Sequence, residues 1–277
     1  MSRPTCPRIR RGDRSRGSAE MPVSEGRVIV TGATRGIGRA TVDAILERGG
    51  RVVAIARDAD ALESLAQSAA GRVRALPSDL EQVERLPELA ERAVDAFGGV
   101  DGLVNCAGVA RYEAVGAIMP ASVEAQLRVN FVAPLLLSQA VSRHMQEGGG
   151  AIVNVSSTLS ERVAQFTTVY AATKAALNTL TKGLALELAP QGIRVNAVLP
   201  GAVDTDMLRA PRLRPGESLS DEELTQRVES QLDALRALHP LGRLGTPAEV
   251  ADAILGALDH AWQTGSLITI DGGLSIR

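Results

Sequence analysis

The fold of this chain is constrained most by a regular alternation of short apolar runs with longer stretches of helical character, which starts near Arg27. The runs are rich in β-branched residues and contain almost no polar positions. They lie at residues 28–30, 52–56, 73–76, 103–104, 152–155, 195–199 and 267–270. Strands that are apolar on both faces and are each followed by a helix predict an α/β fold, with one doubly wound, parallel, seven-stranded sheet in a single domain.

Composition narrows the class of protein. Of the 277 residues, 45% are hydrophobic and the formal net charge is −2, so a strongly basic surface for nucleic acid or anionic membranes is not expected. Charged residues, Gly or Pro interrupt every apolar run before it is long enough to span a bilayer. The two cysteines form no disulfide framework, and His144, His239 and His260 lack ligand spacing, so no metal is expected. The sequence predicts a soluble, cytoplasmic protein with a small-molecule partner.

Two segments depart from the alternation. Residues 1–26 are rich in Arg, Gly, Pro and Ser and nearly free of apolar residues, which predicts a disordered N-terminal tail. Within residues 204–238, the run Ser220-Asp221-Glu222-Glu223 predicts a capping box that opens an amphipathic helix ending near Leu238. Ligands of open α/β sheets bind beyond the carboxyl ends of the strands, so this segment is expected to act as a substrate lid.

The first apolar run leads directly into a glycine-rich turn. Gly32, Gly36 and Gly38 would let the backbone turn sharply and approach a pyrophosphate at a helix N-terminus, as in a Rossmann fold. About 20 to 25 residues further on, where an acidic residue would select NAD, the sequence has Arg57, and Arg35 lies inside the turn itself. Two guanidinium groups favour NADP(H), although each is also compatible with an ordinary surface charge.

A tyrosine and a lysine are four residues apart in a chain with very few of either. On a helix, Tyr170 and Lys174 share a face, and a nearby ammonium favours the phenolate, so the pair is expected to act as one acid/base unit with a lowered tyrosine pKa. Ser157 follows a buried strand and is placed to hydrogen-bond a substrate carbonyl. The alternative for the Tyr170 and Lys174 pair alone is a solvated surface pair. We interpret Cys106 and Trp262 as ordinary packing residues.

Taken in order, these motifs resemble the short-chain dehydrogenase/reductase family from about Arg27 to the C-terminus. Residues 31–38 resemble its cofactor loop, and the thirteen-residue step from Ser157 to Tyr170 is the family's spacing. The C-terminal run Asp271-Gly272-Gly273 matches as well, whereas Cys106 departs from the family's second asparagine. The resemblance implies cofactor contacts from Gly32, Thr34, Arg35, Gly36, Ile37, Gly38, Arg57, Asp79, Leu80, Asn105, Ala107, Gly108, Tyr170, Lys174, Pro200, Gly201, Val203 and Thr205, and a catalytic tetrad of Asn130, Ser157, Tyr170 and Lys174.

The resemblance also implies a reaction. Hydride would pass between the nicotinamide and a ketone or secondary alcohol, with Tyr170 exchanging the proton, Ser157 orienting the oxygen, Lys174 lowering the tyrosine pKa and Asn130 holding a water. Overall the chain resembles 3-oxoacyl-[acyl carrier protein] reductases, which makes a 3-oxoacyl thioester the first substrate candidate. The alternatives are a family alcohol dehydrogenase with a specialised or catabolic substrate and a non-catalytic NADP(H)-binding module. Helices around residues 126–145 and 170–188 carry more apolar positions than one sheet face would bury, and in the family such helices pair between subunits, so the resemblance implies a homotetramer, with a dimer as the alternative.

Overall fold

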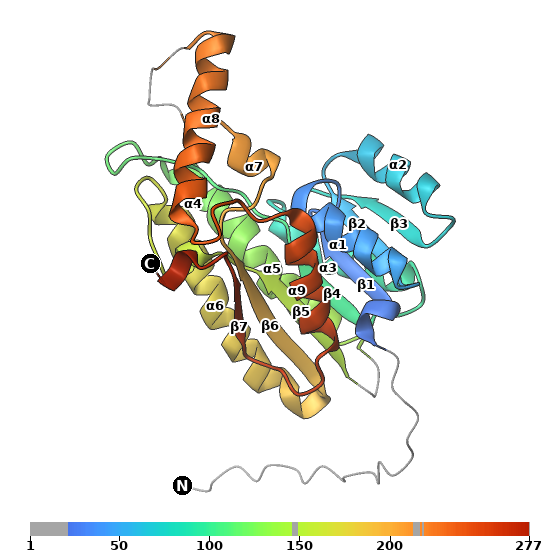
Figure 1. Ribbon diagram of the computed structural model, residues 1–277. Helices are drawn as coiled ribbons and strands as arrows, with labels where there is room; N and C mark the ends of the chain where they lie inside the picture. The colour runs from blue at the N-terminus through green and yellow to red at the C-terminus, as the bar shows by residue number, and fades with distance from the viewer. Residues whose placement is uncertain (1–21, 146–148, 213–216, 218, 277) are drawn as a thin grey trace, which may run out of the picture.

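The computed structural model describes residues 22–145, 149–212, 217 and 219–276, and it contains one parallel sheet of seven strands (Figure 1). The strand order is β3-β2-β1-β4-β5-β6-β7, so the direction of winding reverses between β1 and β4. Every apolar run expected to form a strand lies inside one, and the predicted fold class is confirmed. The strands are β1 (Arg27–Thr31), β2 (Arg51–Ala56), β3 (Val73–Pro77), β4 (Gly102–Asn105), β5 (Gly150–Val155), β6 (Ile193–Pro200) and β7 (Leu267–Ile270).

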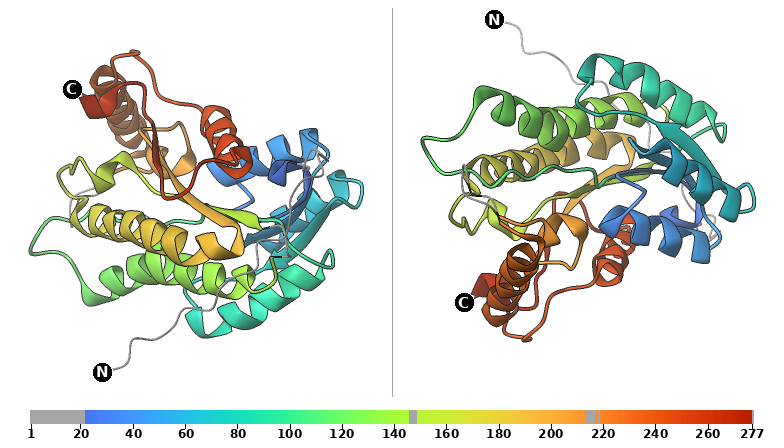
Figure 2. Two further views of the ribbon diagram at one scale, coloured as in Figure 1. Left: turned by 90° about the horizontal axis from the view of Figure 1, so that it is seen from below. Right: turned by 90° about the horizontal axis from the view of Figure 1, so that it is seen from above.

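Helices cover both faces of the sheet (Figure 2). One layer contains α1 (Gly36–Glu47), α2 (Ala59–Ser68) and α9 (Pro247–Asp259), and the other contains α3 (Leu86–Asp95), α5 (Ala133–Ser142) and α6 (Thr168–Leu188). Within β1, Val28 and Val30 pack into the first layer and Ile29 into the second. Successive side chains of a strand point to opposite faces, so burial on both sides requires the continuous apolar runs seen in the sequence.

Further helical segments complete the described chain. The remaining α-helices lie at the carboxyl edge of the sheet, and single turns of 3-10 helix join several of the larger elements. They are α4 (Pro120–Leu127), α7 (Asp206–Arg209), α8 (Asp221–Leu238), the π-helical segment η3 (Arg128–Val132) and the 3-10 turns η1 (Val23–Glu25), η2 (Val83–Arg85), η4 (Thr158–Ser160), η5 (Ala189–Gln191) and η6 (Leu274–Ile276).

The folded domain begins earlier than the composition indicated. Val23–Glu25 form η1, and Ser24 is buried with its backbone N–H and hydroxyl donating to the Asp259 carboxylate at 2.9 and 2.7 Å. The prediction of disorder is therefore wrong for residues 22–26, because a single buried serine with a carboxylate acceptor fixes a segment that carries little apolar surface. The rest of the predicted tail, residues 1–21, lies outside the described residues.

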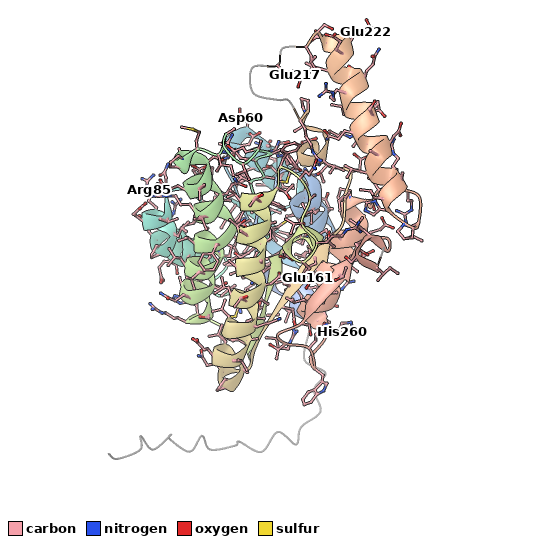
Figure 3. All side chains as sticks on the ribbon, turned by 90° about the vertical axis from the view of Figure 1, so that its left-hand side faces the viewer. Asp60, Arg85, Glu161, Glu217, Glu222 and His260 are labelled. Carbon is pink, nitrogen blue, oxygen red and sulfur yellow. The ribbon has the colours of Figure 1, made fainter. Side chains whose placement is uncertain are left out.

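The helix predicted by the capping box is present. α8 begins after Ser220, whose side chain accepts from the Glu223 N–H while the Glu223 carboxylate accepts from the Ser220 N–H at 2.8 Å. The helix stands out from the sheet, with Glu222 near its outer end (Figure 3). Its contact with the body is narrow, since Leu232 is its one fully buried residue among those described.

Candidate active site

The turn from β1 to α1 builds one wall of the site. Gly32 and Gly36 have φ of +68° and +53°, a backbone conformation that favours glycine. A Cβ at Gly38 would collide with the carbonyl oxygen of Gly32, so glycine is required for the first turn of α1 to pack this closely. The close packing leaves the N-terminus of α1 open toward the carboxyl edge of the sheet, where its free N–H groups favour an anion.

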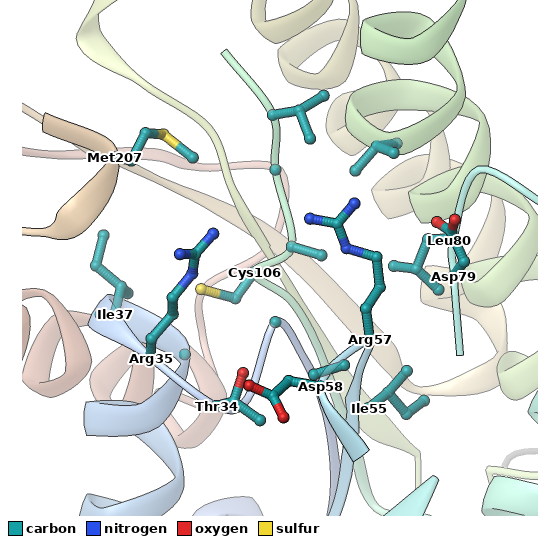
Figure 4. Close-up of a pocket in the computed structure, with 18 of the residues that line it drawn as sticks. Thr34, Arg35, Ile37, Ile55, Arg57, Asp58, Asp79, Leu80, Cys106 and Met207 are labelled. Atoms are coloured by element: carbon teal, nitrogen blue, oxygen red, sulfur yellow. The ribbon is translucent and has the colours of Figure 1, made fainter. Parts of the chain in front are cut away.

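This turn borders a cavity of about 410 Å³ at the point where the winding of the sheet reverses (Figure 4). Ligands of open α/β sheets bind at this switch point. Twelve of the predicted cofactor residues line the cavity: Gly32, Thr34, Arg35, Gly36, Ile37, Gly38, Arg57, Asp79, Leu80, Ala107, Gly108 and Thr205.

Two arginines supply the positive charge of the cavity, whose lining also contains the carboxylates of Asp58, Asp79, Glu81 and Asp206. Arg35 precedes α1 and Arg57 follows β2, and their guanidinium groups rise from opposite sides of the pocket (Figure 4). Arg35 makes a loose, exposed ion pair with Asp206 at 3.7 Å, and Arg57 has no ion-pair partner among the described residues. The neighbouring carboxylate, Asp58, caps α2 by accepting from the Ala61 N–H at 3.0 Å. Both guanidinium groups are therefore available to an anionic group of a ligand.

Asn105 lies beneath the cavity and does not line it. Its side chain is 2% exposed, and its Nδ2 donates to Asn154 Oδ1 at 2.9 Å. The amide therefore links β4 to β5 in the core, and the direct cofactor contact predicted for Asn105 is not what the structure shows. The next two residues make the hydrogen bonds at the cavity side. The N–H groups of Cys106 and Ala107 both donate to Thr31 Oγ1 at 3.0 Å, which fixes the loop after β4 beside the glycine turn.

β5 and α6 bring Ser157, Tyr170 and Lys174 together. Ser157 follows β5 and is 8% exposed, and its side chain hydrogen-bonds the Tyr170 phenol, which is half-buried on the first turn of α6. Lys174 lies one turn further along α6, 3% exposed, with its Nζ 5.7 Å from the centre of the Tyr170 ring. Its Nζ donates to the Val155 carbonyl oxygen at 2.8 Å. These contacts exclude the interpretation of Tyr170 and Lys174 as a solvated surface pair.

The direction predicted for the tyrosine pKa is wrong. Burial raises the pKa of the Tyr170 phenol, the Tyr112 phenol nearby raises it further, and the hydrogen bond with Ser157 opposes them. Burial also lowers the pKa of Lys174 to about 8. The charged form of each group loses water on burial, and this desolvation is the largest cause of both pKa shifts.

Asn130 is placed by a local irregularity of the helix. It lies in the π-helical segment η3 between α4 and α5 and is fully buried. Its Nδ2 donates to the Val109 carbonyl oxygen at 2.8 Å and its Oδ1 accepts from the Val109 N–H at 2.9 Å, so both ends of the amide hold the loop after β4. A Cβ on Gly108 would lie 3.5 Å from both Asn130 Oδ1 and Lys174 Nζ, which places both side chains next to this cavity-lining glycine.

The segment after β6 supports the site from the other side. Thr205 lines the cavity, and its methyl group would lie 3.2 Å from a Cβ on Gly36. Pro200, Gly201 and Val203 lie outside the cavity lining, although Gly201 is held by its N–H donating to the Ile270 carbonyl. Asp271 closes the turn after β7 by accepting from the Gly273 N–H at 2.9 Å, so the C-terminal signature has a structural role beside Gly201.

Some cavity residues were not predicted. The lining also includes Ile55 and Ser78 at the ends of neighbouring strands and Val129 and Met207 from helical segments. The register of β2 and β3 could have identified the first two. Ile55 pairs with Leu76 near the carboxyl end of β3, and Ser78 is the first residue after β3 at the same edge of the sheet. Cys106 packs against the core as expected and also lines the cavity, whereas Trp262 is fully exposed and is not the packing residue that was expected. Burial raises the pKa of the Cys106 thiol to about 12.

The cavity and the residues around it fit a dinucleotide. The glycine turn admits a pyrophosphate where side chains would block it, and the helix N-terminus and two arginines favour negative charge. Ser157, Tyr170 and Lys174 lie outside the cavity lining, but Lys174 Nζ approaches the cavity-lining Gly108, and Tyr170 with its hydroxyl partner is one helical turn from Lys174. A polar pair of this kind can donate a proton to a substrate oxygen and hold that oxygen in place.

The fold and this site define a nicotinamide-linked dehydrogenase class, and comparison with known proteins agrees. Residues 27–215 match the family described as short chain dehydrogenase. The chain is 34% identical over 249 residues to carbonyl reductase family member 4 of Danio rerio, covering 90% of this chain and 97% of that protein. It is 39% identical over 254 residues to L-xylulose reductase of Mesocricetus auratus, covering 90% and 96%.

A solved structure shows the same arrangement. The blue fluorescent protein from a metagenomic library, crystallised in complex with NADPH, superposes with a TM-score of 0.78 at 29% identity, covering 90% of this chain and 98% of that one. The protein therefore belongs to the short-chain dehydrogenase/reductase family of oxidoreductases.

Neither a metal-binding cluster nor a membrane-spanning helix is found among the residues that the structure describes. No group of three or more His, Cys, Asp or Glu side chains there is placed to hold a metal ion. None of the helices in the described ranges combines the length and the apolar character that crossing a bilayer requires.

Proposed function

We propose that this protein is an NADP(H)-dependent oxidoreductase that interconverts a ketone and a secondary alcohol. The observation that carries the proposal is the hydrogen-bonded pair of Ser157 and Tyr170, with Lys174 one helical turn away and its Nζ beside the cavity-lining Gly108. A non-catalytic cofactor-binding module would have no use for a half-buried phenol held by a hydroxyl. The same pair serves alcohol oxidation, so a family alcohol dehydrogenase acting on a specialised substrate remains the second candidate.

The cofactor would be held mainly by the N-terminal half of the site. The N-terminus of α1 with Gly32, Gly36 and Gly38 would hold the pyrophosphate, and Asp79 with Leu80 would border the adenine. Arg35 and Arg57 would bind a ribose phosphate, which supports NADP(H) over NAD(H) because neither faces a strong internal counter-charge. When bound, the nicotinamide supplies or accepts the hydride.

The protein's own residues would handle the proton and the oxygen. Because burial raises the Tyr170 pKa, the phenol stays protonated at neutral pH and can donate its proton to the oxygen of a carbonyl as negative charge develops there. Ser157 would hydrogen-bond the same oxygen and stabilise that charge. Lys174, fixed by the Val155 carbonyl, would hold the ribose beside the nicotinamide. Asn130 would position the Val109 backbone at the cavity wall.

The substrate can be proposed in a broad form, a ketone in general, and in a narrow form, a 3-oxoacyl thioester. The names of two relatives refer to reduction of a carbonyl and of L-xylulose, which supports a ketone substrate in general. Residues 204–238 would act as the lid over the substrate, supported by the presence of Asp206 and Met207 of α7 in the cavity lining.

Assembly into a homotetramer and a cytoplasmic location are also proposed. Leu127 on α4 and Leu186 on α6 are exposed apolar side chains on helices expected to pair between subunits. Pairing with another copy would remove their apolar surface from water. Light scattering on a gel-filtration column would measure the mass in solution, and a monomer would exclude this assembly.

The first experiment is the loss of NADPH absorbance on addition of candidate ketones. Acetoacetyl thioester, L-xylulose and simple methyl ketones are compared, each with NADPH and with NADH. We expect turnover of at least one ketone with NADPH and weaker turnover with NADH. Turnover of thioester alone supports the narrow form, whereas equal use of both cofactors contradicts the role given to the arginines. No reduction of any ketone, combined with no oxidation of secondary alcohols by NADP, would overturn the proposed function.

A further inference from the structure

One arginine near the candidate site lacks a counter-charge. Arg212 is half-buried in the connection between α7 and α8, and its Nε has no exposed surface and no hydrogen-bond partner. The other described arginines of residues 204–238 each face a carboxylate: Arg209 faces Asp204 at 2.7 Å, Arg227 faces Glu217 at 2.8 Å and Arg236 faces Asp233 at 2.5 Å. Within the described part of this segment, Arg212 alone holds a guanidinium without such a partner.

A tyrosine holds this guanidinium beside the candidate site. The Arg212 Cζ lies 4.1 Å from the centre of the Tyr112 ring, close enough for a cation–π interaction. Tyr112 belongs to the loop after β4, which is tied to the start of α6 by the Glu113 N–H donating to the Phe166 carbonyl at 2.9 Å. Tyr112 lies three residues after Val109, which lines the cavity, and its phenol raises the pKa of Tyr170. The Tyr112 ring therefore links Arg212 to the loop that borders the candidate site.

The backbone that leads to Arg212 is also held in place. Gln231 of α8 donates from Nε2 to the Leu208 carbonyl at 2.7 Å and to the Ala210 carbonyl at 3.4 Å. The contact fastens α8 to the chain two residues before Arg212. The α8 contact thus holds the backbone that leads to Arg212, the Tyr112 ring holds the guanidinium, and neither supplies a hydrogen-bond acceptor for its N–H groups.

Chemistry indicates what such a group binds. A partly buried cation without a partner is costly, and the planar guanidinium presents N–H donors in a fork that matches a carboxylate or phosphate. Stacking on an aromatic face leaves the donors at the edge of the guanidinium available. The ligand that satisfies them is an oxyanion that enters with the substrate.

We propose that Arg212 binds an anionic group of the substrate, so that the substrate is a ketone, or the matching secondary alcohol, that carries a carboxylate or phosphate remote from the reacting carbon. The inference rests on the proposed function, because it takes Tyr170 as the proton donor. It narrows the substrate class to oxo acids and phosphorylated ketones, and it makes Arg212 a specificity-determining residue with Tyr112 as its support.

The experiment compares matched pairs of ketones that differ in one charge. The pairs are 4-oxopentanoate and 6-oxoheptanoate, each with its methyl ester, and dihydroxyacetone phosphate with dihydroxyacetone. The readout is the ratio of kcat/KM for the anionic member to that for the neutral member, with NADPH, in the wild type, Arg212→Gln and Arg212→Lys. Arg236→Gln is the matched control, because it removes one positive charge from the same segment at a residue that already has carboxylate partners.

We expect the wild type to prefer the anionic member of at least one pair by tenfold or more. Arg212→Gln should lower that ratio at least tenfold, mainly through KM, Arg212→Lys should retain part of it, and Arg236→Gln should leave it within twofold. The pair with the largest ratio distinguishes carboxylate from phosphate. A wild-type ratio near one for every pair, or a ratio unchanged by Arg212→Gln, would overturn the inference while reduction of the neutral ketones still supports the proposed function.

Calorimetric titration keeps the two proposals separate if no ketone turns over. The NADPH-loaded wild type and Arg212→Gln are titrated with 6-oxoheptanoate, its methyl ester and dihydroxyacetone phosphate. Tighter binding of an anion by the wild type, lost in Arg212→Gln, supports the inference independently of turnover. Equal binding of acid and ester, or no binding of either anion, overturns it.

Discussion

The two ends of the candidate site use their cations in different ways. At the end of β2, Arg57 is exposed beside a wide cavity and is held by no internal ion pair among the described residues. On α6, Lys174 is 3% exposed, donates to the Val155 carbonyl and has its pKa lowered to about 8 by burial. An exposed cation recognises an anion at little cost to the fold, whereas a buried one loses hydration and is tolerated only where its position matters. Binding of the cofactor phosphate by Arg57 and proton transfer near Lys174 are thus assigned to separate parts of the site.

The largest expected effect is on turnover and tests the buried part of the site, around Tyr170. Tyr170→Phe removes the proton donor and keeps the ring, so ketone reduction with NADPH should fall by about 10²–10⁴-fold. The affinity for NADPH, measured by fluorescence titration, should stay within a few-fold, because the arginines and the glycine turn are untouched. Tyr112→Phe is the matched control at the other tyrosine and should cost less than tenfold. A Tyr170→Phe enzyme that kept half of its activity would contradict the role of this residue.

The next largest effect is on cofactor preference and tests the exposed part of the site, around Arg57. Arg57→Asp replaces a phosphate-binding charge with one that repels phosphate, so the ratio of kcat/KM for NADPH to that for NADH should fall by about 10- to 100-fold, as expected from the loss of a charged hydrogen bond of roughly 1.5–3 kcal/mol. Steady-state kinetics with both cofactors measure the ratio. Arg51→Asp makes the same change at the opposite end of β2 and should leave the ratio unchanged. An unaltered ratio in Arg57→Asp would remove the argument for NADP(H).

The smallest effect concerns stability and pH. Lys174→Met should abolish most activity yet raise the free energy of unfolding at pH 7 by on the order of 1 kcal/mol, because the cost of burying the ammonium exceeds the value of its bond to Val155. Below pH 8 the lysine is protonated in both the folded and the unfolded chain, so the cost is complete. Between pH 8 and 10 the folded protein loses this proton first, so the wild type gains stability and the difference should shrink.

Chemical denaturation at pH 7, 8, 9 and 10 measures this trend. Lys182→Met is the control, since Lys182 is exposed on the same helix and should show no such dependence. A Lys174→Met protein that is less stable than the wild type at pH 7, or a difference that grows with pH, would contradict the view of Lys174 as a costly buried cation.

Much of the fold followed from local patterns. All seven strands lie where apolar runs occur, because a strand buried on both faces cannot contain charged residues. The start of α8 followed from its capping box, a local interaction of Ser220 with Glu223. The start of the domain did not follow, because Ser24 is fixed by Asp259, more than 200 residues away in the sequence.

The features of the site also fall into those that local sequence patterns predict and those that long-range contacts decide. The sequence by itself determined the glycine turn, the arginines near it and the helical spacing of Tyr170 and Lys174, since each depends on residues close together in the chain. Only the tertiary structure decided that burial raises the Tyr170 pKa, that Asn105 joins two strands and that Arg212 stacks on Tyr112. Desolvation and long-range contacts depend on which segments pack together, and no local pattern contains that information.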